Sequence, residues 1–253
     1  MQSFTLHRGN SLKLLKELPD NSVDLILTDP PYNLANYSRG NMKFSWRSEI
    51  NNDLAEWDQP VMNPALLVDD VKRILKPTGN AFFFCSYNLI GDYHKAFDPE
   101  FDTFQFMVWH KTNPIPNIRK SSFLNSCELI VCFWNKGHTW NFISQKEMHN
   151  FIESPICGGN ERIKNPKHPT QKPVSILKKI IEIASNKGDV VLDMFSGMFS
   201  SGIAAIETER NFIGIELDKA YFDAGVERIR NAVQNTMFYD SPPVVTATDH
   251  GIE

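Results

Sequence analysis

The chain has 253 residues, of which 42% are hydrophobic, and a formal net charge of -4 at pH 7. This length and composition predict an ordinary globular protein with one sizeable core. No apolar run is long enough to span a membrane, and the four cysteines show no close metal-ligand pairing, so we expect neither a membrane protein nor a metal site. Three cysteines in apolar runs and an N-terminus without an apolar signal region favour a cytoplasmic protein.

Apolar runs and helical stripes alternate along the chain. The pattern predicts strands over residues 3–9, 23–29, 80–85, 103–111, 127–134, 189–195 and 211–218. It predicts helices over residues 11–18, 63–75, 173–185, 201–209 and 219–233. Strand–helix alternation with continuous apolar strands is typical of an α/β fold with a mostly parallel, twisted sheet and helices on both faces.

The predicted elements divide the chain into one domain over residues 1–235 and a polar, flexible tail over residues 236–253. Residues 137–167 have the least regular pattern and form a small segment inserted in this domain. Ligands of such sheets bind at the carboxyl ends of the strands. The loops to examine therefore follow Thr28 and Asp193.

The first of these loops reads LTDPPYNL over residues 27–34. Pro30 and Pro31 fix the backbone and remove two amide donors, which leaves carbonyl acceptors unopposed. Asp29 and the Pro30 carbonyl can together accept both hydrogens of an exocyclic amine, and Tyr32 can stack on the ring that carries it. The alternative is a plain turn at the end of a strand.

The second loop reads VLDMFSGMFSSG over residues 191–202 and has the small residues of a nucleotide-type cofactor loop. An acid at the end of the next strand commonly binds ribose hydroxyls, and Glu216 is in that place. The alternative for Glu216 is a surface acid beside the next helix. Asp218 is better placed to cap that helix.

Four stretches in this order, TDPPYN (28–33), HPTQKP (168–173), VLDMFSG (191–197) and GIELD (214–218), resemble the β-class of S-adenosylmethionine-dependent DNA amino-methyltransferases. The resemblance extends over nearly the whole chain to about residue 230. It implies a Rossmann-like methyltransferase fold. It also implies direct methyl transfer to an exocyclic amine of a base that is flipped out of duplex DNA.

The resemblance assigns roles to residues of each motif. The catalytic set that it implies is Asp29, Pro30, Pro31 and Tyr32. The cofactor-binding set is Asn10, Asp29, Thr170, Lys172, Asp193, Phe195, Gly197 and Glu216. Lys172 has the alternative of a solvent-exposed lysine at the start of a helix, and His168 is expected to be a structural turn residue.

Three stretches of the chain carry basic residues and no acid, at residues 33–48, 111–127 and 162–179. They predict a positive face on a mildly acidic body, although solvated loops are the plainer alternative. With the resemblance, they become candidates for contacts with DNA phosphates. The candidates are Arg39, Lys43, Arg47, Lys111, Arg119 and Lys120.

An aspartate at the start of the catalytic motif resembles the adenine-N6 enzymes more than the cytosine-N4 enzymes, which remain the alternative. The resemblance also favours a homodimer, with target recognition over about residues 137–167. It leaves open whether a restriction endonuclease is a partner. A nicotinamide oxidoreductase is disfavoured because no G-x-G-x-x-G follows a strand.

The cofactor loop departs from the family pattern after Gly197, where Met198 and Phe199 replace a serine and a glycine. A side chain at Phe199 restricts the backbone, so we expect altered cofactor affinity. This departure also motivates a second hypothesis from a different class, a catalytically silent DNA-binding protein that retains the fold.

Overall fold

The structure is a computed structural model. It describes residues 2–32, 42–44, 47–50, 63–118, 120, 122–168, 170–235 and 243–251, with the backbone alone for 42–44 and 47–50. A nine-stranded sheet in the order β11-β1-β10-β9-β2-β5-β7-β6-β8 is its main feature. Its strands are β1 (Ser3–Arg8), β2 (Val23–Thr28), β5 (Leu75–Cys85), β6 (Thr103–Lys111), β7 (Cys127–Trp134), β8 (Phe151–Ser154), β9 (Val190–Asp193), β10 (Asn211–Glu216) and β11 (Val244–Asp249).

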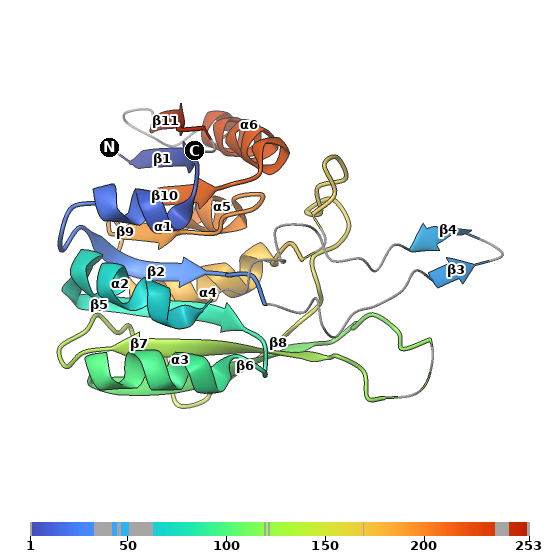
Figure 1. The fold of residues 1–253 in the computed structure, drawn as a ribbon, viewed down its shortest axis with the longest axis horizontal. Helices are drawn as coiled ribbons and strands as arrows, with labels where there is room; N and C mark the ends of the chain where they lie inside the picture. Colours follow the sequence, from blue (N-terminus) through green and yellow to red (C-terminus); the bar gives the residue numbers. More distant parts are fainter. Residues whose placement is uncertain are drawn as a thin grey trace.

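Neighbouring strands of this sheet are parallel except at β7, which is antiparallel to both β5 and β6. The predicted mostly parallel α/β sheet is therefore confirmed. A short antiparallel pair, β3 (Met42–Phe44) and β4 (Arg47–Ile50), lies apart from the main sheet (Figure 1).

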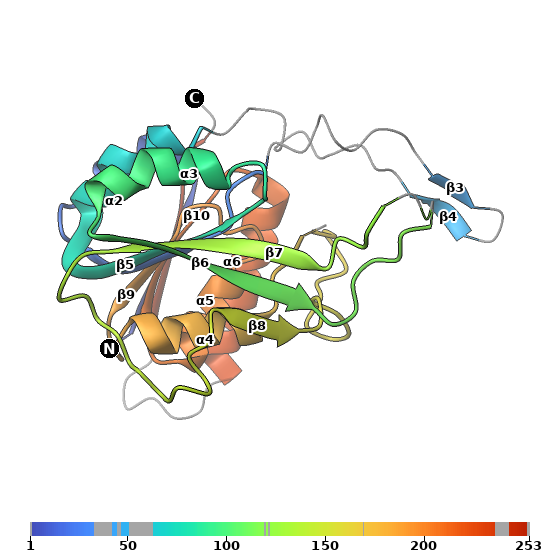
Figure 2. The ribbon, with the colours of Figure 1, turned by 90° about the horizontal axis from the view of Figure 1, so that it is seen from below.

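Helices cover both faces of the sheet, as the two views show (Figures 1 and 2). One face carries α1 (Ser11–Leu14), α2 (Val68–Ile74) and α3 (Ile90–Phe97), and the other carries α4 (Val174–Ala184), α5 (Ser200–Glu207) and α6 (Lys219–Asn235). Side chains of β2 alternate between the two cores: Leu25 and Leu27 pack with α4 and α5, whereas Ile26 packs with α2 and α3. This alternation follows from the two-residue period of a strand.

The helices begin at capping residues or prolines that can be recognised in the sequence. The Asn63 side chain accepts from the amide of Ala65 and begins a 3-10 turn (Pro64–Leu67), which continues into α2. Asn10 caps α1 in the same way, and a second 3-10 turn (Leu15–Glu17) follows that helix. Pro173 stands at the N-cap position of α4, where its missing amide costs no helical hydrogen bond.

Among the elements that the sequence pattern did not predict are β3, β4, α3, β8 and a third 3-10 turn (Asp98–Glu100). The structure also corrects the prediction of a flexible tail, because Val244–Asp249 form β11 and pair with β1 in parallel. The tail's VVTATD run is rich in β-branched residues, which fit a strand, and β1 has an edge to receive it.

The carboxyl ends of β2, β9 and β10 meet at one edge of the sheet, since these strands are parallel. From β9 the chain continues to β10 on one side, and from β2 it continues to β5 on the other side. The strand order therefore diverges between β9 and β2, which is where wound α/β sheets bind their ligands. Within the described residues, every helix is too short or too polar to cross a membrane.

Candidate active site

A cavity of about 390 Å³ opens at this edge of the sheet. Its volume falls within the ~300–1,000 Å³ that is common for small-molecule sites. Both loops predicted from the sequence contribute to its lining. Of the predicted site residues, the lining contains Asn10, Asp29, Pro30, Pro31, Tyr32, Thr170, Lys172, Asp193, Phe195, Gly197 and Glu216. The structure thus brings both predicted sets together around one space.

Asp29 follows β2 directly and has two unlike carboxylate oxygens. Its Oδ2 pairs with the Lys172 ammonium at 2.8 Å. Its Oδ1 is buried and has no hydrogen-bond partner among the residues that the structure describes. Burial raises the pKa of Asp29, although the nearby Lys172 ammonium opposes that shift. Asp29 lines the cavity, and a buried acceptor without a partner on such a residue is suited to receive a donor from a ligand.

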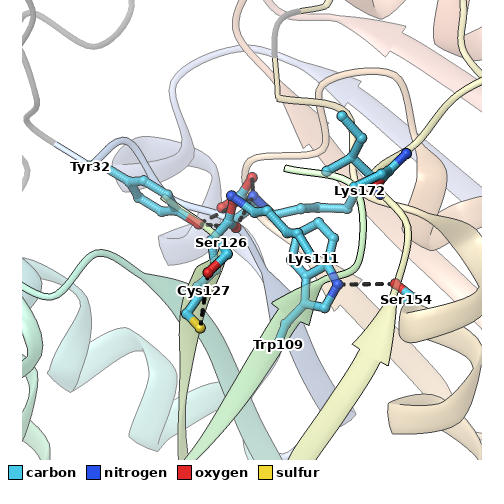
Figure 3. Close-up of polar contacts among 11 residues, drawn as sticks. Tyr32, Trp109, Lys111, Ser126, Cys127, Ser154 and Lys172 are labelled. Carbon is cyan, nitrogen blue, oxygen red and sulfur yellow. Dashed lines mark hydrogen bonds and ion pairs between the residues drawn. The ribbon is translucent and has the colours of Figure 1, made fainter. Parts of the chain in front are cut away.

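Tyr32 lies between the cavity and a charged cluster that consists of Asp29, Lys111, Glu128 and Lys172. Its hydroxyl donates to Glu128 Oε2 at 3.2 Å and accepts from Lys172 Nζ at 3.1 Å (Figure 3). The Lys172 ammonium also lies 5.2 Å from the centre of the Tyr32 ring. The hydroxyl is thus held from two sides, which fixes the direction of the ring.

Lys172 is buried, with 7% of its side chain exposed. The alternative of a solvent-exposed lysine is therefore wrong. Its ammonium pairs with Asp29 and also with Glu128 Oε2 at 2.9 Å. Burial alone would lower the pKa of Lys172, but these two carboxylates raise it above its ordinary value. Lys172 therefore stays charged.

Glu128 was missed by the sequence analysis. Its Oε1 accepts from the ammonium of Lys111 at 2.6 Å, while its Oε2 faces Lys172. Burial acts to raise the pKa of Glu128, but the two lysines lower it to about 2. The signal that could have identified this residue is an acid at the start of an antiparallel strand. Such a strand begins at the edge of the sheet where the strands on either side of it end.

Asp193 ends β9 and is buried beneath the cavity. It accepts hydrogen bonds from the Thr28 hydroxyl at 2.8 Å, from the Ser201 hydroxyl, and from the Phe195 amide at 3.2 Å. Burial raises the pKa of Asp193 to about 6 despite these donors. Asp193 therefore ties β2, β9 and α5 together under the site.

Glu216 ends β10 and closes the opposite side of the loop. Its two oxygens accept from the backbone amides of Gly197 and Asp218, each at 2.7 Å. Burial raises the pKa of Glu216 to about 7. The Asp218 side chain accepts from the amide of Tyr221 at 2.9 Å, so the predicted helix cap is confirmed.

His168 packs over the cofactor loop. Gly197 has a φ of +49°, and a Cβ at that position would lie 2.9 Å from His168 Nε2. Glycine is therefore favoured there both by the backbone, which would be strained with a side chain, and by the close approach of the histidine. Burial, with help from Lys172 and Arg162, lowers the pKa of His168 to about 4, so its ring is neutral.

Phe199 points away from the cavity. It adopts the left-handed conformation, with φ 53° and ψ 40°, and its side chain is fully buried. The ring packs between Phe212 and Phe222 at centroid distances of 6.2 and 6.1 Å. A Cβ at Gly214 would lie 2.5 Å from this ring, and one at Gly225 would overlap it. Two glycines therefore make room for Phe199, and the cavity wall receives Met198 instead.

The predicted DNA contacts are described only in part. Arg39 and Arg119 lie outside the described residues, as do the side chains of Lys43 and Arg47. Lys120 is exposed. Lys111 is 13% exposed at its side chain and is ion-paired with Glu128, so the structure places it in the charged cluster. Its contact with DNA stays a prediction, as does target recognition by residues 137–167.

The residues around the cavity fit S-adenosylmethionine. This cofactor combines a flat base, a ribose diol and a cationic sulfonium. The carboxylates of Glu216, Asp193 and Asp29 lie at the ends of three neighbouring strands and suit the diol and the cationic part. Phe195 and Leu217 provide apolar surface in the same lining.

Comparisons with known proteins agree with this geometry. The family model for DNA methylases (N6_N4_Mtase) matches residues 23–227. The chain is 32% identical to the type II methyltransferase M.HinfI of Haemophilus influenzae, over 91% of this chain and 69% of that protein. It is 28% identical to the type II methyltransferase M2.MboI of Moraxella bovis, over 90% of this chain and 88% of that protein.

Solved structures share the fold. The M1.HpyAVI–SAM complex is 26% identical, with a TM-score of 0.64 over 90% of this chain and 100% of that one. The PvuII cytosine-N4-specific DNA methyltransferase is 18% identical, with a TM-score of 0.66 over 92% of each chain. At that identity the second comparison carries the fold alone.

Phe199→Gly is expected to lower the free energy of unfolding by about 3 kcal/mol. Loss of the buried ring leaves a cavity, and the cost of that cavity exceeds the gain from relieving the left-handed backbone of a phenylalanine. Denaturant unfolding measures this change. Phe123→Gly removes an exposed phenylalanine and is the matched control, with little expected effect. Unchanged stability together with a large gain in cofactor affinity would show instead that Phe199 crowds the cavity.

Proposed function

This chain is a member of the DNA methylase family of N6/N4 amino-methyltransferases, which use S-adenosylmethionine, and we propose that its target is the N6 amine of adenine in duplex DNA. The observation that supports an amine target is the buried Oδ1 of Asp29, which has no hydrogen-bond partner among the described residues and belongs to a residue that lines the cavity. An aspartate, rather than a serine, at the start of the catalytic motif favours adenine over cytosine. The resemblance also leads us to expect a homodimer.

The bound cofactor supplies an electrophilic methyl group. Asp29 Oδ1 and the Pro30 carbonyl accept the two N–H bonds of the amine, which turns the nitrogen lone pair out of conjugation and toward the donor. Tyr32 stacks on the base, which must leave the duplex to reach this depth. Positioning and charge complementarity then supply most of the rate.

No nucleophilic side chain is needed for direct transfer. Cys85 lies at the end of β5, next to β2, and burial raises the pKa of its thiol to about 12. A thiol that holds its proton this strongly is a poor nucleophile at neutral pH. This property is in keeping with an in-line displacement by the amine itself.

Cytosine-N4 methylation is the runner-up, since both amines fit the same pair of acceptors. A catalytically silent DNA-binding protein was suggested by Met198 and Phe199. Phe199 lies outside the cavity lining, so it gives no support to a defective cofactor loop.

Incubation with methyl-labelled S-adenosylmethionine and mixed duplex DNA, followed by nucleoside analysis, tests the target base. Label in N6-methyl-2′-deoxyadenosine is the expected result. Label in N4-methylcytosine would replace adenine by the runner-up. Absence of label, together with unmeasurable cofactor binding, would refute enzyme function.

Asp29→Ala is expected to reduce methyl transfer by at least about 10³-fold, because the amine loses its charged acceptor. Cofactor affinity, measured by calorimetry, should change far less than the transfer rate, because Glu216 and Asp193 remain in the lining. Asp20→Ala removes an exposed aspartate near the other edge of the sheet and serves as the control. Transfer at a comparable rate in Asp29→Ala would contradict the amine-acceptor role.

Cofactor affinity is expected to fall below about pH 7, where Glu216 becomes protonated in the cofactor-free protein. Ribose hydroxyls donate to the carboxylate form, so the affinity should fall as the pH is lowered. Well below pH 7 this fall should approach about tenfold per pH unit. The same raised pKa makes the cofactor-free protein lose stability as pH rises from about 4.5 to about 7, since the folded state binds the proton more tightly. Calorimetric titration across this range checks the first expectation.

Glu216→Gln is the matched variant for that titration. It should bind the cofactor more weakly at pH 8, and the part of the pH dependence near pH 7 should disappear. The part that remains below about pH 6 is expected from Asp193. An affinity that is constant from about pH 5.5 to 8 in the unmodified protein would contradict the assignment of Glu216.

A further inference from the structure

Glu128 stands at the centre of a buried cluster of four charges. Its two oxygens bind two different ammonium groups, Lys111 at 2.6 Å and Lys172 at 2.9 Å. Lys172 in turn binds Asp29 at 2.8 Å. The four side chains are between 7% and 20% exposed. Two carboxylates and two ammonium groups balance one another, which buried charges require.

The topology explains why an acid from β7 reaches the active site. Because β7 runs antiparallel to β5 and β6, its first residues lie at the edge where β2 and β6 end. Glu128 is the second residue of β7 and pairs with Trp109 of β6. The Trp109 indole donates to the Ser154 hydroxyl at 3.0 Å, which joins β8 to the same edge (Figure 3).

The contacts of Lys172 use all the donors that an ammonium has. It has three N–H bonds, and its three acceptors are Asp29 Oδ2, Glu128 Oε2 and the Tyr32 hydroxyl. The ring of Phe84 flanks the ammonium at a centroid distance of 4.9 Å. The ammonium is therefore fixed in position, and it engages one Asp29 oxygen only.

We propose that Glu128 is a positioning residue: it holds the Lys172 ammonium against one oxygen of Asp29, so that the other oxygen stays available for the target amine. Without Glu128, Lys172 loses one acceptor, and the cluster keeps two ammonium groups against the single carboxylate of Asp29. The Lys172 ammonium then moves onto both Asp29 oxygens and competes with the amine. This inference rests on the proposed amine-acceptor role of Asp29.

Glu128 acts as a fixed anion in this scheme and takes no proton during the reaction. The Lys111 and Lys172 ammonium groups keep the pKa of Glu128 at about 2, far below that of a useful base. The titratable groups that face the cluster are Asp29 and Tyr32 after β2, Lys111 on β6 and Lys172 before α4. Further away are Cys85 on β5, Tyr93 on α3, Asp193 on β9, and His168.

The test compares Glu128→Gln with Glu100→Gln. Glu100 is an acid that pairs with Lys72 at the surface and does not line the cavity, so its variant is the control for the change of charge. Glu128→Gln is expected to lower kcat by about 10²-fold, with the Kd for S-adenosylmethionine within about twofold. Its acid limb of activity should move to lower pH, because Asp29 loses a nearby negative charge. Glu100→Gln should match the unmodified protein.

A double-mutant cycle with Lys172→Met tests whether Glu128 acts through the lysine. If it does, Glu128→Gln should have little further effect on kcat in the Lys172→Met background. Full additivity of the two effects would overturn the proposal. So would an unchanged kcat and pH profile in Glu128→Gln, or a loss of cofactor affinity and thermal stability that accounts for the whole defect.

Carboxyl ¹³C titration of Asp29 in the cofactor-free protein separates this inference from the proposed function. Glu128→Gln should lower the pKa of Asp29 whether or not the unmodified protein methylates DNA. An unchanged Asp29 pKa would overturn the positioning role. Failure of the unmodified protein to label DNA would instead refute the proposed function.

Discussion

The active site depends on a charge constraint: the buried Lys172 ammonium and its two carboxylates must neutralise one another. Burying a single ion costs several kcal/mol, and the cost is offset only when its partners have good geometry. Here the partners come from three segments that are far apart in the sequence, the loop after β2, the start of β7 and the loop before α4. The requirement to pair these charges therefore fixes the loop after β2 against the HPTQKP segment.

The directions of the strands bring these charged residues together, although they are far apart in the sequence. Parallel strands deliver Asp29, Asp193 and Glu216 to one edge, each at or just after the end of its strand. The single reversal at β7 adds Glu128 to that edge from the opposite chain direction. Two kinds of acid result. Asp193 and Glu216 have raised pKa values because burial dominates, whereas Glu128 has a lowered pKa because two lysines bind it. Asp29 has a raised pKa as well, because it meets one ammonium where Glu128 meets two, so the number of paired lysines decides which way burial is answered.

Much of this architecture can be predicted from the sequence, because apolar runs bounded by turn residues mark strands well. The strands at 103–111 and 127–134 have the observed bounds, and both chemistry-bearing loops fall at the cavity. The misses have physical reasons. Helix α3 is only eight residues long and buries only Tyr93 and Phe97, so its apolar stripe is short. Strand β11 is mostly exposed, and it forms by pairing with the edge of β1, which local sequence does not reveal. Glu128 could not be identified without the direction of β7, which a single sequence does not state.

The cofactor loop shows why a departure from a family pattern cannot be judged at one position. Phe199 stands where a glycine is expected, yet the left-handed backbone that would favour glycine is retained, and it turns the ring into the core. Gly214 on β10 and Gly225 on α6 provide the space, and Arg228 from the same helix donates to the Met198 carbonyl at 2.9 Å. The Phe199 side chain, expected from the sequence to alter cofactor binding, is instead part of the packing that holds the loop. The loop's shape is therefore set by a group of residues spread over about thirty positions, and compensation within that group leaves Gly197 and Glu216 in contact across the site.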